Sequence, residues 1–321
     1  MKLIALLAFC AGTGLTVFLI VHAGLTPVAS ALASLGVTGL LVIALVHLPV
    51  VAMLGAAWWA VGRGQGRRAL SRFIWARAIR DAAAEALPFS QVGGYVIGAR
   101  ALSLTGTDAA SSAVSTLLDL VLELLPKLPY VLLGLILLEA AKPSSGTAVA
   151  IVAFLVVLIV AAAVLRPNAK RFGMGWIERF LARWPRLAES RERIAAAFAQ
   201  MTARRSAIAA SLTLHFVCWI AGAAETWLIF RLMGTSVSLP AALVIDSLLG
   251  ALRMISFFVP AAIGVQEGGY VLLCGLFGFP PGAALAFSFA RRARDILIAA
   301  PVLLSWQAIE GQALLPSRSK S

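Results

Sequence analysis

The chain has 321 residues, of which 61% are hydrophobic and 13% are charged, and its mean hydropathy is +0.94. A soluble domain carries far more charge on its surface, so this composition excludes an ordinary water-soluble enzyme and indicates a polytopic membrane protein. The formal net charge of +13 does not indicate a nucleic-acid-binding protein, because the sequence contains no aromatic-rich recognition module.

Apolar stretches long enough to cross a bilayer recur along the chain. One crossing as a helix needs about 20 mostly apolar residues, and this requirement is met at 3–21, 37–61, 147–165, 207–230, 240–259 and 283–306. A longer stretch, 109–139, contains Pro126 and Pro129 and is expected as one kinked helix or two short ones. The expected fold is all-α: a polytopic membrane helical bundle of about seven to eight spans.

Basic residues concentrate in two segments between the spans, 62–80 and 166–205. Short loops rich in Lys and Arg stay on the cytoplasmic side of a membrane, so both segments are expected to be cytoplasmic. The arginine-rich stretch 67–84 is expected as a helix that lies in the membrane interface. The segment 166–205 would join two halves, about 37–165 and 207–306, of a single membrane domain.

A short motif occurs twice, as "QVGGYV" at 91–96 and as "QEGGYV" at 266–271. In both copies a turn and an Ala-rich stretch follow, and the similarity predicts an internal repeat with two short broken or re-entrant helices. Such interruptions at matching places mark the substrate site of secondary transporters. For the glycines alone, close helix packing is the favoured explanation. The candidate site residues of the two copies are Gln91, Gly93, Gly94, Gln266, Gly268 and Gly269.

Charged residues gather around the two copies, inside apolar stretches. A charge at membrane depth costs about 2.5 kcal/mol or more and is a functional candidate by default. Arginines outnumber acids at 291–295, which is expected to leave at least one arginine unneutralised and so favours an anionic partner. The alternative is a structural network in which the charges cancel one another. The charged candidates are Arg100, Asp119, Arg253, Glu267, Arg292, Arg294 and Asp295.

A resemblance to a known family rests on the second copy and its surroundings. The run "FFVPAAIGVQEGGYVLLCGLFGFPPGAALAFSFARRARD" resembles the signature of the flippase-like transmembrane family shared with lysylphosphatidylglycerol synthases. Gly264 and Glu267 match the turn and the acid of that signature, and Arg292 matches its arginine. More narrowly, "LPFSQVGGYVIGARAL" with "GVQEGGY" and "ARRARD" is similar to the HpnL-like branch associated with hopanoid biosynthesis in bacteria.

The chain departs from the family pattern in three respects. It has Gly94 where an acid is frequent, and it lacks the usual Glu-Arg pair before Asp119. It also lacks the soluble aminoacyl-transfer domain of the synthases, so no lysyl transfer is expected. The first two departures weaken any transfer of headgroup specificity from the phospholipid members.

The resemblance implies a multi-pass protein of the bacterial inner (plasma) membrane that binds a hopanoid or a phospholipid between its halves and moves or localises it. Arg100, Arg292 and Arg294 would hold the headgroup, while Glu267 and Asp295 would set the arginine positions or exchange a proton. No enzymatic activity, cofactor or metal is expected, because the sequence shows no nucleotide-binding motif and no metal-ligand spacing.

Two alternatives remain open at this stage. One is a non-catalytic membrane scaffold that holds hopanoid- or lipid-synthesis enzymes through the basic segment 166–205. The other is a small intramembrane enzyme that uses Glu267 as its acid or base. A homo-oligomer is compatible with the transporter hypothesis and with both alternatives.

Overall fold

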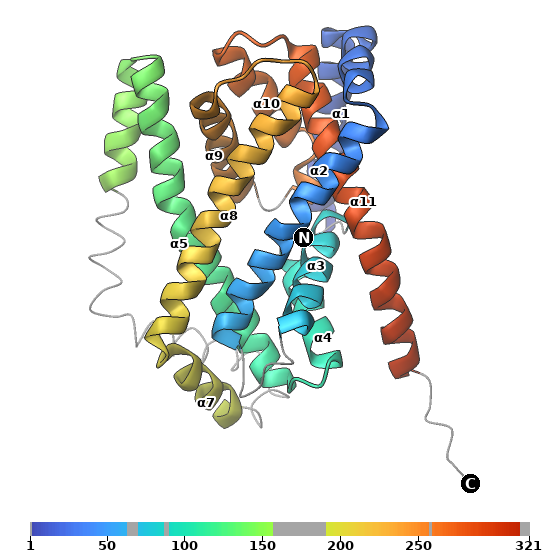
Figure 1. Ribbon diagram of the computed structural model, residues 1–321, viewed down its shortest axis with the longest axis vertical. Helices are drawn as coiled ribbons and strands as arrows, with labels where there is room; N and C mark the ends of the chain where they lie inside the picture. The colour runs from blue at the N-terminus through green and yellow to red at the C-terminus, as the bar shows by residue number, and fades with distance from the viewer. Residues whose placement is uncertain (1, 63–69, 87–89, 157–190, 257–258, 315–321) are drawn as a thin grey trace.

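The computed structural model describes residues 2–62, 70–86, 90–156, 191–256 and 259–314 (Figure 1). Over these residues the chain is helical apart from short turns and contains no strand, which confirms the all-α class. In chain order the principal helices are α1 (Lys2–Ala23), α2 (Leu25–Gly62), α3 (Leu70–Ala86), α4 (Ser90–Leu104), α5 (Ala109–Ala141), α7 (Arg191–Thr202), α8 (Arg205–Leu232), α9 (Leu239–Ile255), α10 (Val265–Leu276) and α11 (Pro281–Leu314).

The outer surface of the helices is suited to a bilayer. Three of the described helices, α2, α5 and α8, are long and apolar enough to cross a membrane. Large apolar side chains point outward, and Phe18, Leu45 and Val149 are 62%, 65% and 66% exposed. Such a surface would be unstable in water and is expected where lipid tails surround the protein. The stretch around Pro126 and Pro129 is one continuous helix, α5.

A long helix, two short helices and a second long helix occur twice in this order, as α2 to α5 and as α8 to α11. The two sets have opposite directions, because α2 and α8 are antiparallel: His47 contacts Glu225, and the Cys218 thiol donates to the Val50 carbonyl oxygen. The short helices α3 and α4 lie in the lower half of Figure 1, and α9 and α10 lie in its upper half. This arrangement is an inverted repeat, as found in secondary transporters.

The repeat boundaries expected at 37–165 and 207–306 stay a prediction, because 157–190 lie outside the described residues.

The two motif copies each begin a short helix near the middle of the bundle. Helices α4 and α10 have 15 and 12 residues, which gives lengths of about 22 and 18 Å, shorter than the ~30 Å hydrocarbon core. This confirms the two short broken or re-entrant helices. The ends of α3 and α9 meet through an ion pair between Glu85 and Arg253. The two pairs of short helices, the hairpins α3–α4 and α9–α10, therefore contact each other at these helix ends.

The second glycine of each copy allows the two helices of a hairpin to pack closely. A Cβ atom on Gly94 would lie 2.7 Å from the carbonyl oxygen of Arg80 in α3, and one on Gly269 would lie 2.6 Å from a methyl group of Leu249 in α9. Both distances are shorter than any ordinary carbon contact. The packing explanation for the repeated glycines therefore holds at these two positions.

The turn before α10 depends on another glycine. Gly264 has a φ of 80° and begins α10, and a Cβ atom there would lie 2.5 Å from the carbonyl oxygen of Gly12 in α1. A left-handed φ and this close approach both favour glycine. Helix α1 therefore packs directly on the turn of the second hairpin.

The arginine-rich stretch differs from its expected place in the interface. From Leu70 onward it is helix α3, which packs against α2, α4 and α11. Arg77 and Arg80 are only 3% and 2% exposed, because the helix turns them toward acids of α5 instead of lipid headgroups. The interfacial interpretation of 67–84 is thus wrong for the described part, 70–84. The membrane side on which the basic segments lie stays a prediction.

Candidate functional site

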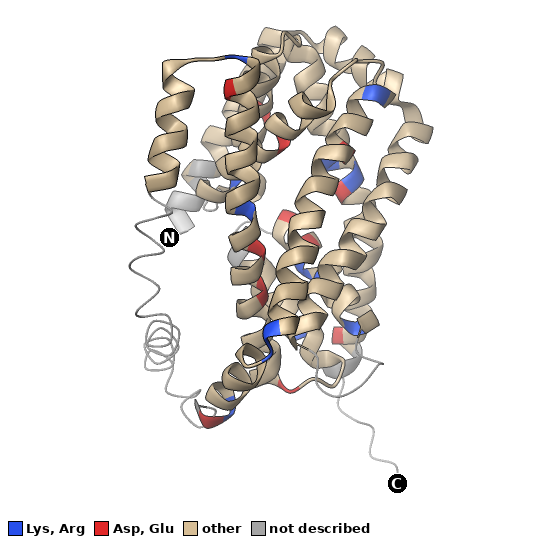
Figure 2. Cartoon of the chain, turned by 60° about the vertical axis from the view of Figure 1, so that its left-hand side comes forward, with Lys and Arg blue, Asp and Glu red and all other residues tan. Residues whose placement is uncertain are grey.

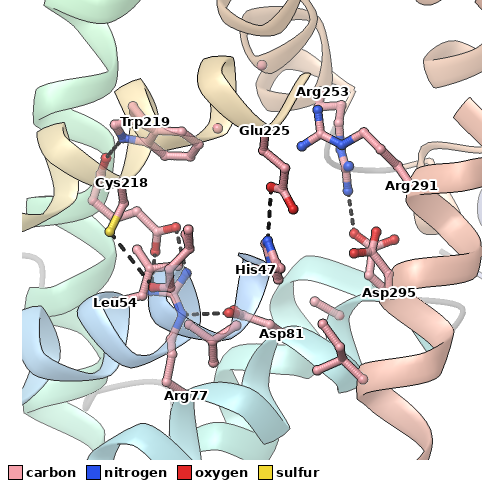
Figure 3. Close-up of a pocket in the computed structure, with 18 of the residues that line it drawn as sticks. His47, Leu54, Arg77, Asp81, Cys218, Trp219, Glu225, Arg253, Arg291 and Asp295 are labelled. Carbon is pink, nitrogen blue, oxygen red and sulfur yellow. Dashed lines mark hydrogen bonds and ion pairs between the residues drawn. The ribbon is translucent and has the colours of Figure 1, made fainter. Parts of the chain in front are cut away.

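A cavity of about 560 Å³ lies between the two halves, with walls from α2 to α5 and from α8 to α11. Figure 2 shows charged residues at mid-height of the helices, well away from their ends. Figure 3 shows side chains of α2, α3, α8, α9 and α11 around one space, with His47 directed at Glu225. The charged lining residues are Arg77, Asp81, Glu85, Glu123, Lys127, Glu225, Asp246, Arg253, Arg291, Arg294 and Asp295.

One wall is an ion-pair cluster between α3 and α5. The Arg80 guanidinium donates to Asp119 at 2.7 Å and to Glu123 at 2.6 Å. Arg77 donates to both oxygens of Glu123, at 2.9 and 3.0 Å. His215 of α8 contacts the second oxygen of Asp119 at 3.1 Å. The i,i+4 spacing of Asp119 and Glu123 places both acids on one face of α5, where they face the two arginines.

The opposite wall is a second ion-pair cluster in which the charges are exchanged: the short helix α9 carries the acid and the long helix α11 carries the arginine. Arg291 of α11 donates to Asp246 of α9 at 2.7 Å and to the hydroxyl of Tyr270 at 3.0 Å. The hydroxyls of Tyr130 and Thr226 donate to the same Asp246 carboxylate at 2.9 and 3.1 Å. Asp246 of α9 therefore accepts hydrogen bonds from three other helices, α5, α8 and α11.

The long helices are joined across the cavity by a third group. Glu225 of α8 lies 3.0 Å from the imidazole of His47 in α2 and 2.5 Å from the guanidinium of Arg294 in α11. Arg294 also donates to its neighbour Asp295 at 2.7 and 2.9 Å. Glu225 and Arg294 are 3% exposed, so this ion pair is shielded from solvent. The contact between His47 and Glu225 links the two halves directly.

Glu267 has a structural place beside the cavity. One carboxylate oxygen accepts a hydrogen bond from the Gly264 amide at 2.7 Å, which caps the first turn of α10. The other accepts from the Arg292 guanidinium at 2.8 Å and from the Ser288 hydroxyl at 2.9 Å. The Gln266 side chain accepts from Arg253 at 2.9 Å. The second motif copy thus fixes the hairpin turn and orients one arginine of the cavity.

The arginines at 291–295 all have acidic partners, contrary to the expectation that one would be unneutralised. Arg291 pairs with Asp246, Arg292 with Glu267, and Arg294 with Glu225 and Asp295. Apart from Asp295, the partners come from α8, α9 and α10, so a count of charges along α11 alone does not include them. The excess of arginine is therefore no argument for an anionic partner.

The predicted site residues fall into several groups. Arg253, Arg294 and Asp295 line the cavity. Asp119, Gln266, Glu267 and Arg292 bond to lining residues or shape the turn beside them. The predicted glycines are Gly93, Gly94, Gly264, Gly268 and Gly269, which belong to the hairpins. The side chain of Gln91 lies outside the described residues.

Arg100 is separate from the cavity. Its side chain is 49% exposed and pairs with Glu310 near the end of α11, at 2.9 Å. The sequence placed Arg100 beside the first motif copy, but nine residues of helix carry it away from the middle of the bundle.

Sequence reasoning missed the tyrosine that both motif copies contain. Tyr95 and Tyr270 occupy the fifth position of the two copies, and both line the cavity. The Arg80 guanidinium lies 4.8 Å from the Tyr95 ring centre, and Arg291 bonds to the Tyr270 hydroxyl. The repeated letter was the available signal. His47 and Glu225 gave no comparable signal, because they are 178 positions apart.

The comparison with known families covers nearly the whole chain. The model of the family described as the lysylphosphatidylglycerol synthase TM region matches residues 3–302, which include both hairpins and every cavity-lining residue. No curated protein and no solved structure matches the chain. In the described residues, no group of three or more His, Cys, Asp or Glu side chains could hold a metal ion. The chain is an integral membrane protein that belongs to the family of the lysylphosphatidylglycerol synthase TM region.

Proposed function

We propose that the protein transports a membrane lipid, a hopanoid or a phospholipid, across the inner membrane of a bacterium. In this proposal the cavity receives the polar headgroup while the apolar tail stays in the bilayer. Membership of a family related to lipid metabolism or transport supports the proposal. The observation that carries it is the cavity of about 560 Å³, lined by paired charges from both inverted halves.

The size of the cavity agrees with a headgroup. Sites for small ligands have volumes of about 300–1,000 Å³, whereas the two acyl chains of a phospholipid would need far more room. The charged lining replaces the water that a polar headgroup loses on entering the membrane. Large exposed apolar side chains on the outer helices provide the surface along which the tail would follow.

The contacts between the halves suit a rocking motion. Inverted repeats alternate access by moving one half against the other around a fixed site. The ion pair between Glu85 and Arg253 and the contact between His47 and Glu225 join the two halves at the cavity. These contacts would exchange partners when the cavity opens to the other side. In the proposal, the basic residues that precede α3 and the segment 166–205 lie on the cytoplasmic side, whereas Arg77 and Arg80 of the expected segment 62–80 belong to the cavity wall.

The proposal is for a transporter and not for an enzyme. The acid considered for catalysis, Glu267, has both oxygens engaged in holding the turn and in an ion pair with Arg292. A membrane scaffold for lipid-synthesis enzymes is the second candidate, but it requires no polar cavity at membrane depth. The experiment below separates these two functions.

The test is transport by purified protein in liposomes. A fluorescent phospholipid and a fluorescent hopanoid are each placed in both leaflets, and dithionite added outside destroys the outer label. Wild type is expected to expose most of the inner label to dithionite for at least one lipid. Asp295→Asn, which changes a cavity-facing acid that is 24% exposed, is expected to slow this loss at least tenfold. Glu310→Gln, on the surface pair, is the matched control.

Two results would contradict the proposal. Wild type that exposes no more label than protein-free liposomes for either lipid would favour the scaffold. Equal rates of label loss for Asp295→Asn and wild type would show that transport does not depend on the charged lining of the cavity.

A further inference from the structure

Lys127 differs from the other basic residues that line the cavity. Five lining residues are Lys or Arg, and the four arginines each pair with a carboxylate. Within the described part of the chain, Lys127 has no carboxylate within ion-pair distance and makes no hydrogen bond. Its contact is with an aromatic ring: the Lys127 ammonium lies 4.2 Å from the ring centre of Trp219.

The acids of the cavity are already occupied. Six lining residues are Asp or Glu, and each has an arginine partner. Glu123 lies one turn from Lys127 on α5, but both of its oxygens accept from Arg77 and Arg80. With six acids and five bases, the net charge of the lining is close to zero and does not indicate the charge of a ligand. The position of Lys127, whose charge has no ion-pair partner among the described lining residues, is more informative.

Lys127 cannot reach water by extending along its helix. It lies 18 residues after the start of α5 and 14 before its end, which is about 27 and 21 Å of helix. A lysine side chain is far shorter than either distance, so its ammonium stays at membrane depth. An ammonium group has three N–H donors and is costly to leave without acceptors in such a place.

The surroundings hold the ammonium in the cavity and leave its donors free. Gly250 of α9 has no side chain, and a Cβ atom there would lie 3.1 Å from Cε of Lys127. The Trp219 ring is itself fixed, because its indole N–H donates to the Glu123 carbonyl and the ring stacks on Tyr130. Attraction to the ring face positions the charge without using an N–H donor. Figure 3 shows Trp219 at the edge of the cavity, on the side of α5 and α8.

We propose that Lys127 and Trp219 form the anion-binding subsite of the cavity and that the transported headgroup carries a phosphate. This inference rests on the proposed function and selects among its substrates. A phosphate oxygen would accept from the ammonium, while the paired arginines and acids would surround the polar remainder of the headgroup. An uncharged polyol would leave the Lys127 charge without a counterion and would bind less tightly.

The experiment measures lipid selectivity by native mass spectrometry of protein in a neutral maltoside detergent. Wild type is titrated with dioleoyl phosphatidylglycerol and, separately, with an uncharged glucosyl diacylglycerol. Wild type is expected to bind the phospholipid at least tenfold more tightly than the glycolipid. Lys127→Gln is expected to reduce that ratio about tenfold, at the lower end of what a charge-assisted hydrogen bond contributes. Lys127→Arg, which keeps the charge, is expected to retain most of the ratio.

The ratio separates a binding role from a structural one. A general loss of packing around Trp219 would weaken both lipids together and leave the ratio unchanged. A ratio for Lys127→Gln equal to that of wild type would overturn the inference and leave the proposed transport intact. If wild type retained neither lipid, the proposed function would fail first. Inorganic phosphate is the final arm: displacement of the phospholipid by an equal concentration of phosphate would indicate a site for the free anion and overturn the lipid assignment.

Discussion

Alanine placed at three glycines of the repeated motifs should affect stability in a fixed order. Gly94→Ala puts a methyl group 2.7 Å from the Arg80 carbonyl oxygen and 2.8 Å from Cβ of Ala84, and neither atom can move without the backbone of α3. Gly269→Ala meets the ends of two leucine side chains, at 2.6 and 2.7 Å, which can rotate. Gly268→Ala meets nothing nearer than 3.7 Å.

The magnitudes follow from two opposing contributions. Overpacking costs about 1–3 kcal/mol, and alanine in a helix gains up to about 1 kcal/mol over glycine. Gly94→Ala should therefore lower the free energy of unfolding by about 1–2 kcal/mol, Gly269→Ala by less, and Gly268→Ala should leave it unchanged or raise it by up to ~1 kcal/mol.

Steric trapping in bicelles measures the free energy of unfolding of such variants without irreversible aggregation. The variants differ by one methyl group, so expression and detergent binding are matched. If Gly268→Ala were as destabilising as Gly94→Ala, the glycine pairs would serve some purpose other than the packing of the hairpins.

Three further predictions give shorter tests. Asp119→Asn should lower the free energy of unfolding by about 3–5 kcal/mol, because it removes one of the buried carboxylates that neutralise Arg77 and Arg80 and leaves both to share Glu123. Its control, Glu310→Gln in an exposed pair, should change the free energy of unfolding by less than about 1 kcal/mol in the same assay. Glu267→Gln should slow lipid transport in liposomes, since the turn before α10 loses its ion pair with α11, and unchanged transport would remove Glu267 from the account. Burial alone would raise the pKa of Asp108, but hydrogen bonds from Ser111 hold that pKa below its usual value. The ionised Asp108 side chain should therefore stabilise the N-terminus of α5 fully above the ordinary carboxyl pKa of about 4. Asp108→Ala should lower the free energy of unfolding by about 1 kcal/mol at pH 7, and by less as the pH falls through the depressed pKa.

The sequence was sufficient for the class of fold and for the existence of two related hairpins. Composition excludes a soluble protein, and the repeated "GGYV" letters locate α4 and α10 to within a few residues. The sequence could not show whether the two repeats have the same or opposite directions in the membrane, because the two copies of the motif have the same residues in either case. The direction appears only in contacts such as that between His47 and Glu225.

Ion pairs were predicted less well than helices for a physical reason. A charge can be assigned to a helix face from its spacing, as for Asp119 and Glu123, but its partner lies on another helix. Arg77 and Arg80 were assigned to a lipid surface because arginine-rich stretches are common there. Only the packing of α3 against α2, α4 and α11 and its ion pairs with acids of α5 show that both arginines are buried. Arg100 was predicted to belong to the site because it follows the first motif copy closely in sequence. It lies at the other end of α4, so its side chain pairs with Glu310 and does not reach the cavity.

Lipid retained by the purified protein tests most directly whether the cavity is a lipid site. Ala78 lines the cavity and carries no charge, so Ala78→Phe fills space without removing an ion pair. Val96 on α4 is 65% exposed and is absent from the cavity lining, so Val96→Phe is the matched control. Mass spectrometry of the lipids that co-purify should show one lipid class enriched with wild type and with Val96→Phe and depleted with Ala78→Phe. Equal lipid in all three would contradict the account and leave the buried charges with a structural role.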